Sequence, residues 1–162
     1  MKKVIAMALC VVMLFSLTAC GRGLLPNLDL VSSNTQAASD FYDCVVESQA
    51  LLDEVADDIY SCWYDYVYED EYTSVDMALY VALAINEDNL TRIEELDVEI
   101  ASLFKDAKES KCGPQVKAVM SAYSDYYELV VNVSGSFSTY SESKEKMKKE
   151  LASCLKDLSY EL

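Results

Sequence analysis

Apolar residues recur at steps of three and four along most of this chain, which is the period of an α-helix and not the alternation of a β-strand. The first stripe predicts a helix over roughly residues 39–69, and its members are Phe41, Cys44, Ser48, Leu51, Val55, Ile59, Cys62 and Tyr66. From residue 39 to the end the chain holds two glycines and one proline, too few for the many turns of an all-β protein. We therefore expect an all-α fold.

Two further helices follow from the same period. The second is predicted to begin after Thr73 or Ser74, either of which can cap a helix, and its stripe is Leu79, Ala82, Ile85, Ile93, Leu96, Ile100, Leu103 and Ala107. The stripe has no apolar residue at positions 86–89, which permits a kink in the helix there. The clearest break is Cys112-Gly113-Pro114, because glycine suits a C-terminal cap and proline suits the first turn of the next helix. The third stripe is Val116, Met120, Tyr123, Tyr127 and Val130.

The segment Ser134-Gly135-Ser136 leaves two architectures open. The apolar stripe resumes in phase after it, which permits one long C-terminal helix, and continues through Phe137, Tyr140, Met147, Leu151, Leu155 and Leu158. A glycine between two serines costs roughly 1 kcal/mol of helix propensity, and either serine can cap a new helix. The sequence thus predicts an antiparallel helical bundle of three long or four helices, and we favour four.

The first twenty residues have the pattern of an export signal. Lys2 and Lys3 precede an apolar run over residues 4–17 that is too short to span a bilayer comfortably. The run closes with Leu17-Thr18-Ala19-Cys20-Gly21, which resembles the lipobox of bacterial lipoproteins. The resemblance implies that residues 1–19 are a cleaved signal peptide and that Cys20 is the lipidated N-terminus. We expect a chain anchored by lipid at the cell membrane or cell envelope, outside the cytoplasm.

The remaining chain is expected to form a tether and one domain. Residues 20–38 include Gly21, Gly23 and Pro26, followed by a polar stretch over 32–36, and this composition predicts a disordered, flexible tether. Residues 39–162 are predicted to form a single acidic helical-bundle domain. A chain of this length can bury one core.

Charge excludes one large class of partner. Removal of residues 1–19 takes away two lysines and no acid, so the mature chain has 11 basic and 28 acidic side chains and a formal charge of −17. Residues 20–100 hold 2 basic and 19 acidic groups. A chain with this negative charge is repelled by the phosphates of nucleic acid, so we expect no nucleic-acid binding. The acidic first helices are expected to be offset by the C-terminal lysines Lys144, Lys146, Lys148 and Lys149.

The residue types present exclude most catalytic sites. The chain has no histidine, so it has no Ser-His or Cys-His nucleophile pair and no His-ligated metal. It has no Gly-rich phosphate loop and no Cys-x-x-Cys motif. The acidic clusters lack a calcium-loop pattern and are interpreted as solvated surface. We expect a non-enzymatic protein without cofactor or metal.

The tyrosines near the end of the first helix form the candidate binding surface. Tyr60, Tyr64, Tyr68 and Tyr72 follow one another at four-residue steps and form a second stripe beside the buried one. Tyrosine is favoured at interfaces, although a wide face of a bundle helix would give the same pattern. The acidic turn next to this stripe, Glu69-Asp70-Glu71, completes the candidate surface.

Two short motifs resemble a loose group of small helical bacterial lipoproteins of uncharacterised function. One is a Trp-Tyr pair late in the first helix, and the other is a Ser-Gly-Ser-aromatic turn late in the chain. The matching residues are Trp63-Tyr64 with Tyr68, and Ser134-Gly135-Ser136-Phe137 with Tyr140 and Ser141. The resemblance supports an all-helical fold and implies no activity.

Four cysteines in the exported domain allow disulfides. Cys44 and Cys62 lie 18 residues apart on one predicted helix, about 27 Å by helical rise, whereas bridged Cα atoms lie within roughly 7 Å. With Cys154 on a fourth helix, the geometry predicts at most one bridge, most readily between Cys44 and Cys112. Cys62 is then expected to be a buried free thiol.

Two functions remain in competition. The first is a non-enzymatic cell-envelope lipoprotein that presents a helical interaction surface to an envelope protein partner. The second is an extracytoplasmic small-molecule, peptide or cation binding protein with a site between helices. A cavity lined by the first-helix tyrosines would favour the second, and a flat surface the first.

Overall fold

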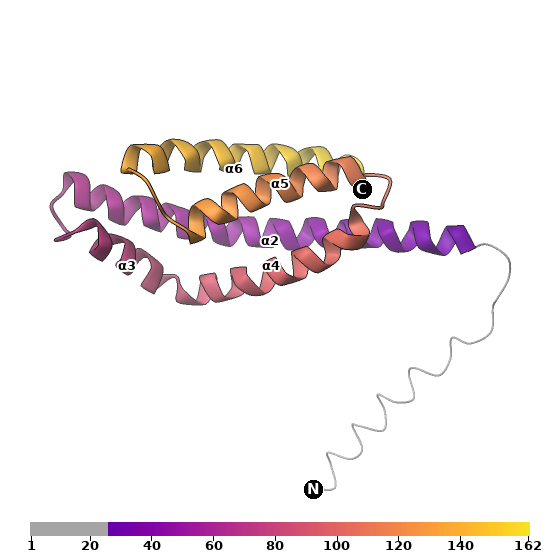
Figure 1. The fold of residues 1–162 in the computed structure, drawn as a ribbon, viewed down its shortest axis with the longest axis horizontal. Helices are drawn as coiled ribbons and strands as arrows, with labels where there is room; N and C mark the ends of the chain where they lie inside the picture. Colours follow the sequence, from indigo (N-terminus) through magenta and orange to yellow (C-terminus); the bar gives the residue numbers. More distant parts are fainter. Residues whose placement is uncertain (1–25) are drawn as a thin grey trace, which may run out of the picture.

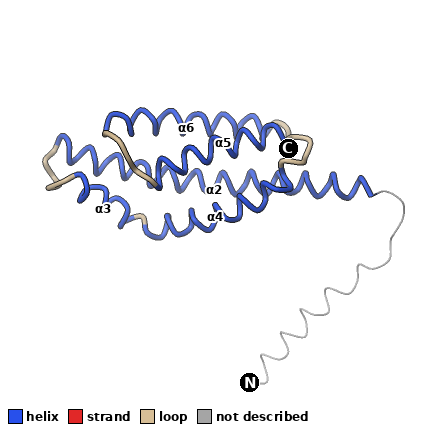
Figure 2. The backbone as a smooth tube through the Cα atoms, viewed as in Figure 1, coloured by secondary structure: helices blue, strands red, loops and turns tan. Residues whose placement is uncertain are grey.

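The computed structural model describes residues 26–162, which form five helices and no strand (Figures 1 and 2). The helices are α2 (Pro26–Tyr68), α3 (Val75–Ile85), α4 (Glu87–Ala107), α5 (Gly113–Val131) and α6 (Phe137–Ser159). The predicted signal peptide, the lipidation site Cys20 and tether residues 20–25 lie outside the described residues. Among the helices described, none is long and apolar enough to cross a membrane.

The helices form an antiparallel bundle, as the sequence predicts (Figure 1). Helices α3 and α4, separated by a kink, together form one member of this bundle. Polar contacts between α2 and α4 show the antiparallel register: Asn89 donates to Glu54 at 3.0 Å and Arg92 to Glu47 at 2.9 Å. Long α2 packs against each of the other four helices. The bundle core is therefore built around α2.

The first helix begins earlier than the sequence predicts. The tether expected through residue 38 is too long at its C-terminal end, because residues 34–38 lie in α2 (Pro26–Tyr68). Proline is well tolerated in the first turn of a helix, where its missing N–H leaves no hydrogen bond unmade. Neither glycine nor a second proline follows before residue 39. Ala38 is fully buried in the core, so packing reaches into the predicted tether.

The predicted kink between residues 86 and 89 is present as the short break between α3 and α4. Ser74 caps α3 by accepting a hydrogen bond from the backbone N–H of Met77 at 3.2 Å. At the break, the buried Asn86 side chain donates to Asp58 of α2 at 2.8 Å and to the Ala82 carbonyl at 2.9 Å. These bonds satisfy polar groups that the break would leave exposed.

The α4–α5 turn lies at the predicted break, but its glycine has a different role. Gly113 is the first residue of α5 and not the cap of α4, whose C-cap is Lys108. A Cβ at Gly113 would meet the backbone carbonyl oxygen of Lys108. Only glycine lets α5 start this close to the end of α4, and Pro114 then occupies the first turn of α5.

Residues 132–136 turn the chain back, so the C-terminal part forms two helices. Gly135 has a φ of +89°, a left-handed conformation that glycine adopts without steric cost. Ser136 then caps α6 by accepting a hydrogen bond from the backbone N–H of Thr139 at 3.2 Å. Of the two architectures that the sequence left open, the four-membered bundle is the one formed.

Candidate functional site

The candidate surface lies at the end of the bundle where α2 finishes, where α3 begins and where α5 turns into α6 (Figure 1). We call this end, comprising residues 60–77 and 132–140, the distal end. It lies opposite the end of the bundle where α2 starts. The candidate residues Tyr60, Tyr64, Tyr68, Tyr72, Glu69, Asp70 and Glu71 all belong to it.

Three of the four predicted tyrosines form a ladder along α2. The ring centroids of Tyr60 and Tyr64 are 6.2 Å apart, and those of Tyr64 and Tyr68 are 4.7 Å apart. Phe137, from the first turn of α6, contacts all three, at 5.2 Å from Tyr60, 6.2 Å from Tyr64 and 6.0 Å from Tyr68. We call Tyr60, Tyr64, Tyr68 and Phe137 the aromatic ladder.

The aromatic ladder changes from core to surface toward its outer end. Tyr60 is half-buried, Tyr64 is 38% exposed and Tyr68 is 61% exposed. Beneath it, the buried Trp63 packs against Phe137 at 6.0 Å and Tyr140 at 5.7 Å. The buried Trp63 thus supports the inner side of the ladder, and the outer rings, Tyr64 and Tyr68, are exposed to solvent.

Tyr72 does not belong to the ladder, so the predicted four-residue series is wrong at its last step. The helix ends at Tyr68, and Asp70 adopts a φ of +55° that breaks the helical path. Tyr72 instead folds back, and its hydroxyl donates to the Cys62 thiol at 3.6 Å. That hydrogen bond, together with burial, raises the pKa of Tyr72 to about 12.

The inner end of the ladder already holds a cation. Lys144 of α6 is buried, and its Nζ lies 4.6 Å from the centroid of the Tyr60 ring and 2.6 Å from a carboxylate oxygen of Asp57. An ammonium over a tyrosine face is attracted by the ring quadrupole. The chain therefore binds one of its own lysines through a tyrosine and a carboxylate together.

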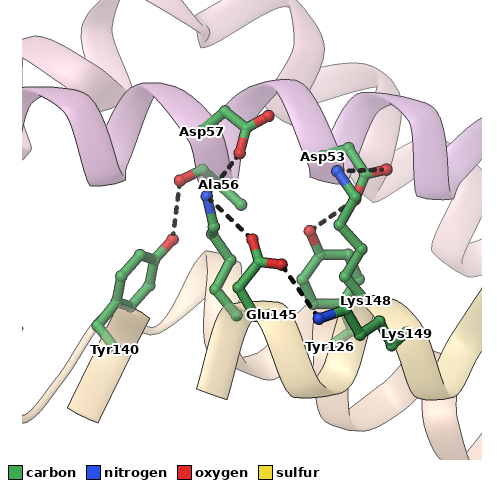
Figure 3. A network of polar contacts seen from close by, with 9 residues as sticks. Asp53, Ala56, Asp57, Tyr126, Tyr140, Glu145, Lys148 and Lys149 are labelled. Atoms are coloured by element: carbon green, nitrogen blue, oxygen red, sulfur yellow. Dashed lines mark hydrogen bonds and ion pairs between the residues drawn. The ribbon is translucent and has the colours of Figure 1, made fainter. Parts of the chain in front are cut away.

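Further polar contacts tie α5 and α6 to α2 beside this lysine (Figure 3). Asp53 accepts a hydrogen bond from the Tyr126 hydroxyl at 2.7 Å and forms an ion pair with Lys148 at 3.2 Å. The Tyr140 hydroxyl donates to the backbone carbonyl of Ala56 at 3.4 Å. Lys144 and Lys148 thus offset acidic groups of α2 as the charge pattern predicts, whereas Lys149 pairs with Glu145 on its own helix at 3.7 Å.

The distal end is acidic and lacks a countercharge. It carries five carboxylates, four of them exposed, and none forms a side-chain hydrogen bond or ion pair in the described part of the chain: Asp65, Glu69, Asp70, Glu71 and Asp76. No lysine or arginine occurs between residues 26 and 91. Over residues 26–162, no three Asp, Glu or Cys side chains are placed to hold a metal ion.

The Cys44–Cys112 bridge that the sequence favours is not formed, since all four cysteines of the described chain are free thiols. Cys44 lies beside Glu99 of α4, eight residues before that helix ends, or about 12 Å by helical rise. Cys112 lies beyond that end, where its thiol is 3.1 Å from the Ser110 hydroxyl. Burial and the Glu99 carboxylate raise the pKa of Cys44 to about 11, and Cys62 is buried, as its place on the apolar stripe predicts.

The hollow that sequence reasoning missed lies away from the aromatic ladder. It is a groove of about 460 Å³ along the outer face of α3 and the first turns of α4, and its lining includes Tyr80 and Leu90. None of the ladder residues lines it. The signal that points to it is the composition of α3, where Asp76 is the single charged residue among eleven. Ile85, expected in the buried stripe, is 64% exposed.

Comparisons with protein-family models, with curated proteins and with solved structures found no match to this chain.

Proposed function

We propose that this chain is a non-enzymatic cell-envelope lipoprotein, anchored through Cys20, whose distal end docks a basic segment of an envelope protein partner. The observation that carries the proposal is the pairing of exposed tyrosines with unpaired carboxylates at one end of the bundle. Tyr64 and Tyr68 offer partly exposed rings, and Asp65, Glu69 and Glu71 offer negative charge. Tyrosines and arginines are the residue types that interfaces favour.

The internal Lys144 site supports this choice of partner chemistry. In that site a tyrosine ring and a carboxylate hold an ammonium group. The outer rungs of the aromatic ladder repeat the same two components without a cation of the chain's own. A lysine or arginine of a partner would supply it, and a partly desolvated cation–π contact contributes about 0.5 to 2 kcal/mol.

The length of α2 supports a role at a distance from the anchor. Its 43 residues span about 65 Å by helical rise. The lipid would be attached upstream of the start of α2, so the distal end is the part of the bundle that projects furthest along the helix from the anchor. A surface placed there is suited to reach a partner that does not lie against the same membrane surface.

The ladder geometry favours a protein partner over a small ligand held between helices. The ladder rings pack on one another and on Phe137, and no ladder residue lines the groove on α3 and α4. Partly exposed aromatic rings offer contact area to a protein, whereas small-molecule sites are concave.

Capture of the partner from intact envelopes tests the proposal. With the lipidated full-length chain as bait, we expect a specific envelope protein to be retained, and the double substitution Tyr64→Ser with Tyr68→Ser to reduce its recovery by about tenfold, since aromatic anchors carry much interface energy. Quantitative mass spectrometry of the bound fraction measures the change. Higher salt should lower the recovery as well, because the contact is partly electrostatic.

Tyr160→Ser is the matched control, because Tyr160 is also an exposed tyrosine, 74% accessible, at the far end of α6. It should leave the recovery unchanged. Equal recovery with the wild-type chain and the Tyr64→Ser, Tyr68→Ser chain would contradict the proposed surface, whatever proteins are retained.

The anchor is tested separately by Cys20→Ala. Without the acceptor cysteine we expect the chain to move from the detergent phase to the aqueous phase in a phase-partition assay, because two or three acyl chains would otherwise hold it firmly. A Cys20→Ala chain that stays in the detergent phase after loss of residues 1–19 would contradict a single lipid anchor.

A further inference from the structure

Helix α3 is apolar on every face, yet it is covered on one side only. Ten of its eleven residues carry no polar side chain other than the hydroxyl of Tyr80, and Asp76 is the exception. A helix that is apolar all round is usually buried. Here only Ala78 and Ala82 are fully buried, whereas Met77 is 47% and Tyr80 is 69% exposed. The outer face of α3 is thus an apolar surface that the bundle leaves open.

The groove continues from this face across the kink onto α4. Its apolar lining comes from Tyr80, Leu83 and Ala84 on α3 and from Leu90 on α4, and its acidic lining comes from Glu87 and Glu94. With Met77 these residues follow the three- and four-residue steps of one helical face. The stripe covers about 12 Å of α3, from residue 77 to residue 85, and about 10 Å of α4, from residue 87 to residue 94, so its natural occupant is a few turns of helix and not a small molecule.

The kink that shapes the groove is fixed to α2. Asn86 donates to Asp58 at 2.8 Å, and Asn89 donates to Glu54 at 3.0 Å and to Asn86 at 3.1 Å. This network sets the angle between α3 and α4 before anything binds. A preformed surface loses little conformational entropy on association.

The charges that line the groove indicate what kind of partner helix it can bind. Glu87 and Glu94 form no ion pair among the described side chains, and the nearest basic residue in the sequence, Arg92, is held by Glu47 at 2.8 Å and Glu95 at 3.1 Å. The stripe therefore presents apolar residues at its α3 end and unpaired carboxylates at its α4 end. An occupant with the complementary pattern has leucine-type residues at one end of a face and lysines or arginines at the other.

We propose that the α3–α4 groove is a second docking site, which binds an amphipathic basic helix of a partner protein. Recognition is of the helix-in-groove kind, in which apolar anchors at steps of three and four enter a hydrophobic groove. The groove shares no lining residue with the aromatic ladder, so the two proposed sites can be tested with different variants.

A designed peptide tests the groove directly. The probe is a fluorescent helical peptide with leucines on one face and lysines at one end, compared with a twin in which every lysine is glutamine. The full-length lipidated chain is held in zwitterionic nanodiscs, and binding is measured by fluorescence anisotropy after subtraction of empty nanodiscs. We expect Tyr80→Ser and the double change Glu87→Gln with Glu94→Gln each to weaken binding of the lysine peptide by about tenfold.

Matched controls separate this site from general attraction to an acidic protein. Glu109→Gln with Glu150→Gln removes the same charge at two exposed positions outside both proposed sites, and Tyr160→Ser removes an exposed tyrosine elsewhere. Both should change the affinity by less than about twofold, and circular dichroism should show that every variant keeps its helices, because the substituted side chains are exposed. The glutamine twin should bind about tenfold more weakly than the lysine peptide.

Three results would overturn the proposal. The first is an equal loss of affinity in the groove charge variant and in the Glu109→Gln, Glu150→Gln control, which would show nonspecific attraction. The second is no loss in either groove variant. The third is a dimer of the chain that Tyr80→Ser dissociates in light scattering, which would assign the groove to a second copy of this chain. None of these results bears on the distal end, whose test uses different residues.

Discussion

Above pH ~10 the bundle is expected to lose stability steeply, because three tyrosines are fully buried in its core. Tyr123, Tyr126 and Tyr140 are each 0% exposed. Burial raises the pKa of all three above the ordinary value of a phenol, and the hydrogen bond to Asp53 raises that of Tyr126 further. The folded protein therefore keeps these phenols protonated at a pH where the unfolded chain has released their protons.

The sign follows from proton counting. Below pH ~10 both states hold the phenol protons and the contribution to stability is complete. As the pH rises further, the unfolded state binds fewer protons than the folded state, so the free energy of unfolding falls. Each group contributes about 1.4 kcal/mol per pH unit, and three give about 4 kcal/mol per pH unit. Set against a typical stability of roughly 5–15 kcal/mol, this predicts alkaline unfolding within a few pH units.

Two optical signals followed together measure this. Far-ultraviolet circular dichroism reports the helices, and phenolate absorbance reports ionised tyrosine. Of the twelve tyrosines, we expect Tyr123, Tyr126 and Tyr140 to ionise only as the helical signal is lost. Tyr140→Phe should make the loss of stability with pH shallower by about 1.4 kcal/mol per pH unit, since one linked phenol is gone. Complete ionisation of all tyrosines in a protein that keeps its helical signal would contradict the prediction.

How far the sequence predicts this fold can be traced at particular residues. Helical periodicity locates each helix, because an amphipathic face must be buried. It cannot decide whether the stripe through Val130 and Phe137 belongs to one helix or to two, because the phase is kept across the turn. That choice depends on the left-handed φ of Gly135 and on the contacts of Phe137 and Tyr140 with α2. These contacts join residues more than seventy positions apart, and no local pattern contains them.

The sequence predicts the candidate site only in part, because local spacing shows neighbours on one helix and not contacts between helices. Tyr60, Tyr64 and Tyr68 lie together because they share one helix, and helical spacing is enough to see it. Tyr72 has the right spacing, but the helix ends first, and the positive φ of Asp70 that ends it has no strong sequence signal. Phe137, which covers the ladder, comes from another helix. The sequence does not show the groove on α3, because an apolar residue at helical spacing predicts burial, and whether another helix covers it depends on tertiary packing.

The second large effect is expected at Tyr140, in the first turn of α6 after the C-terminal turn. This side chain is fully buried, packs on Trp63 at 5.7 Å, and joins α6 to α2 through its hydroxyl, 3.4 Å from the Ala56 carbonyl oxygen. Tyr140→Ala removes a large aromatic ring from a core that cannot fully collapse around the loss. We expect the free energy of unfolding to fall by about 3–5 kcal/mol, the range for aromatic-to-alanine changes in cores. Urea denaturation followed by circular dichroism measures it.

Two controls show whether the packed ring or its hydroxyl carries that loss. Tyr140→Phe keeps the ring and removes only a long hydrogen bond, so it should cost about 1 kcal/mol or less. Tyr160→Ala, at an exposed site, should stay within about 0.5 kcal/mol of the wild type. Because Trp63 is the single tryptophan and touches Tyr140, its fluorescence should change in the Tyr140→Ala variant before denaturant is added. If Tyr140→Ala were no more destabilising than Tyr140→Phe, α6 would not pack on α2 through this ring, and the single long C-terminal helix would again be the better architecture.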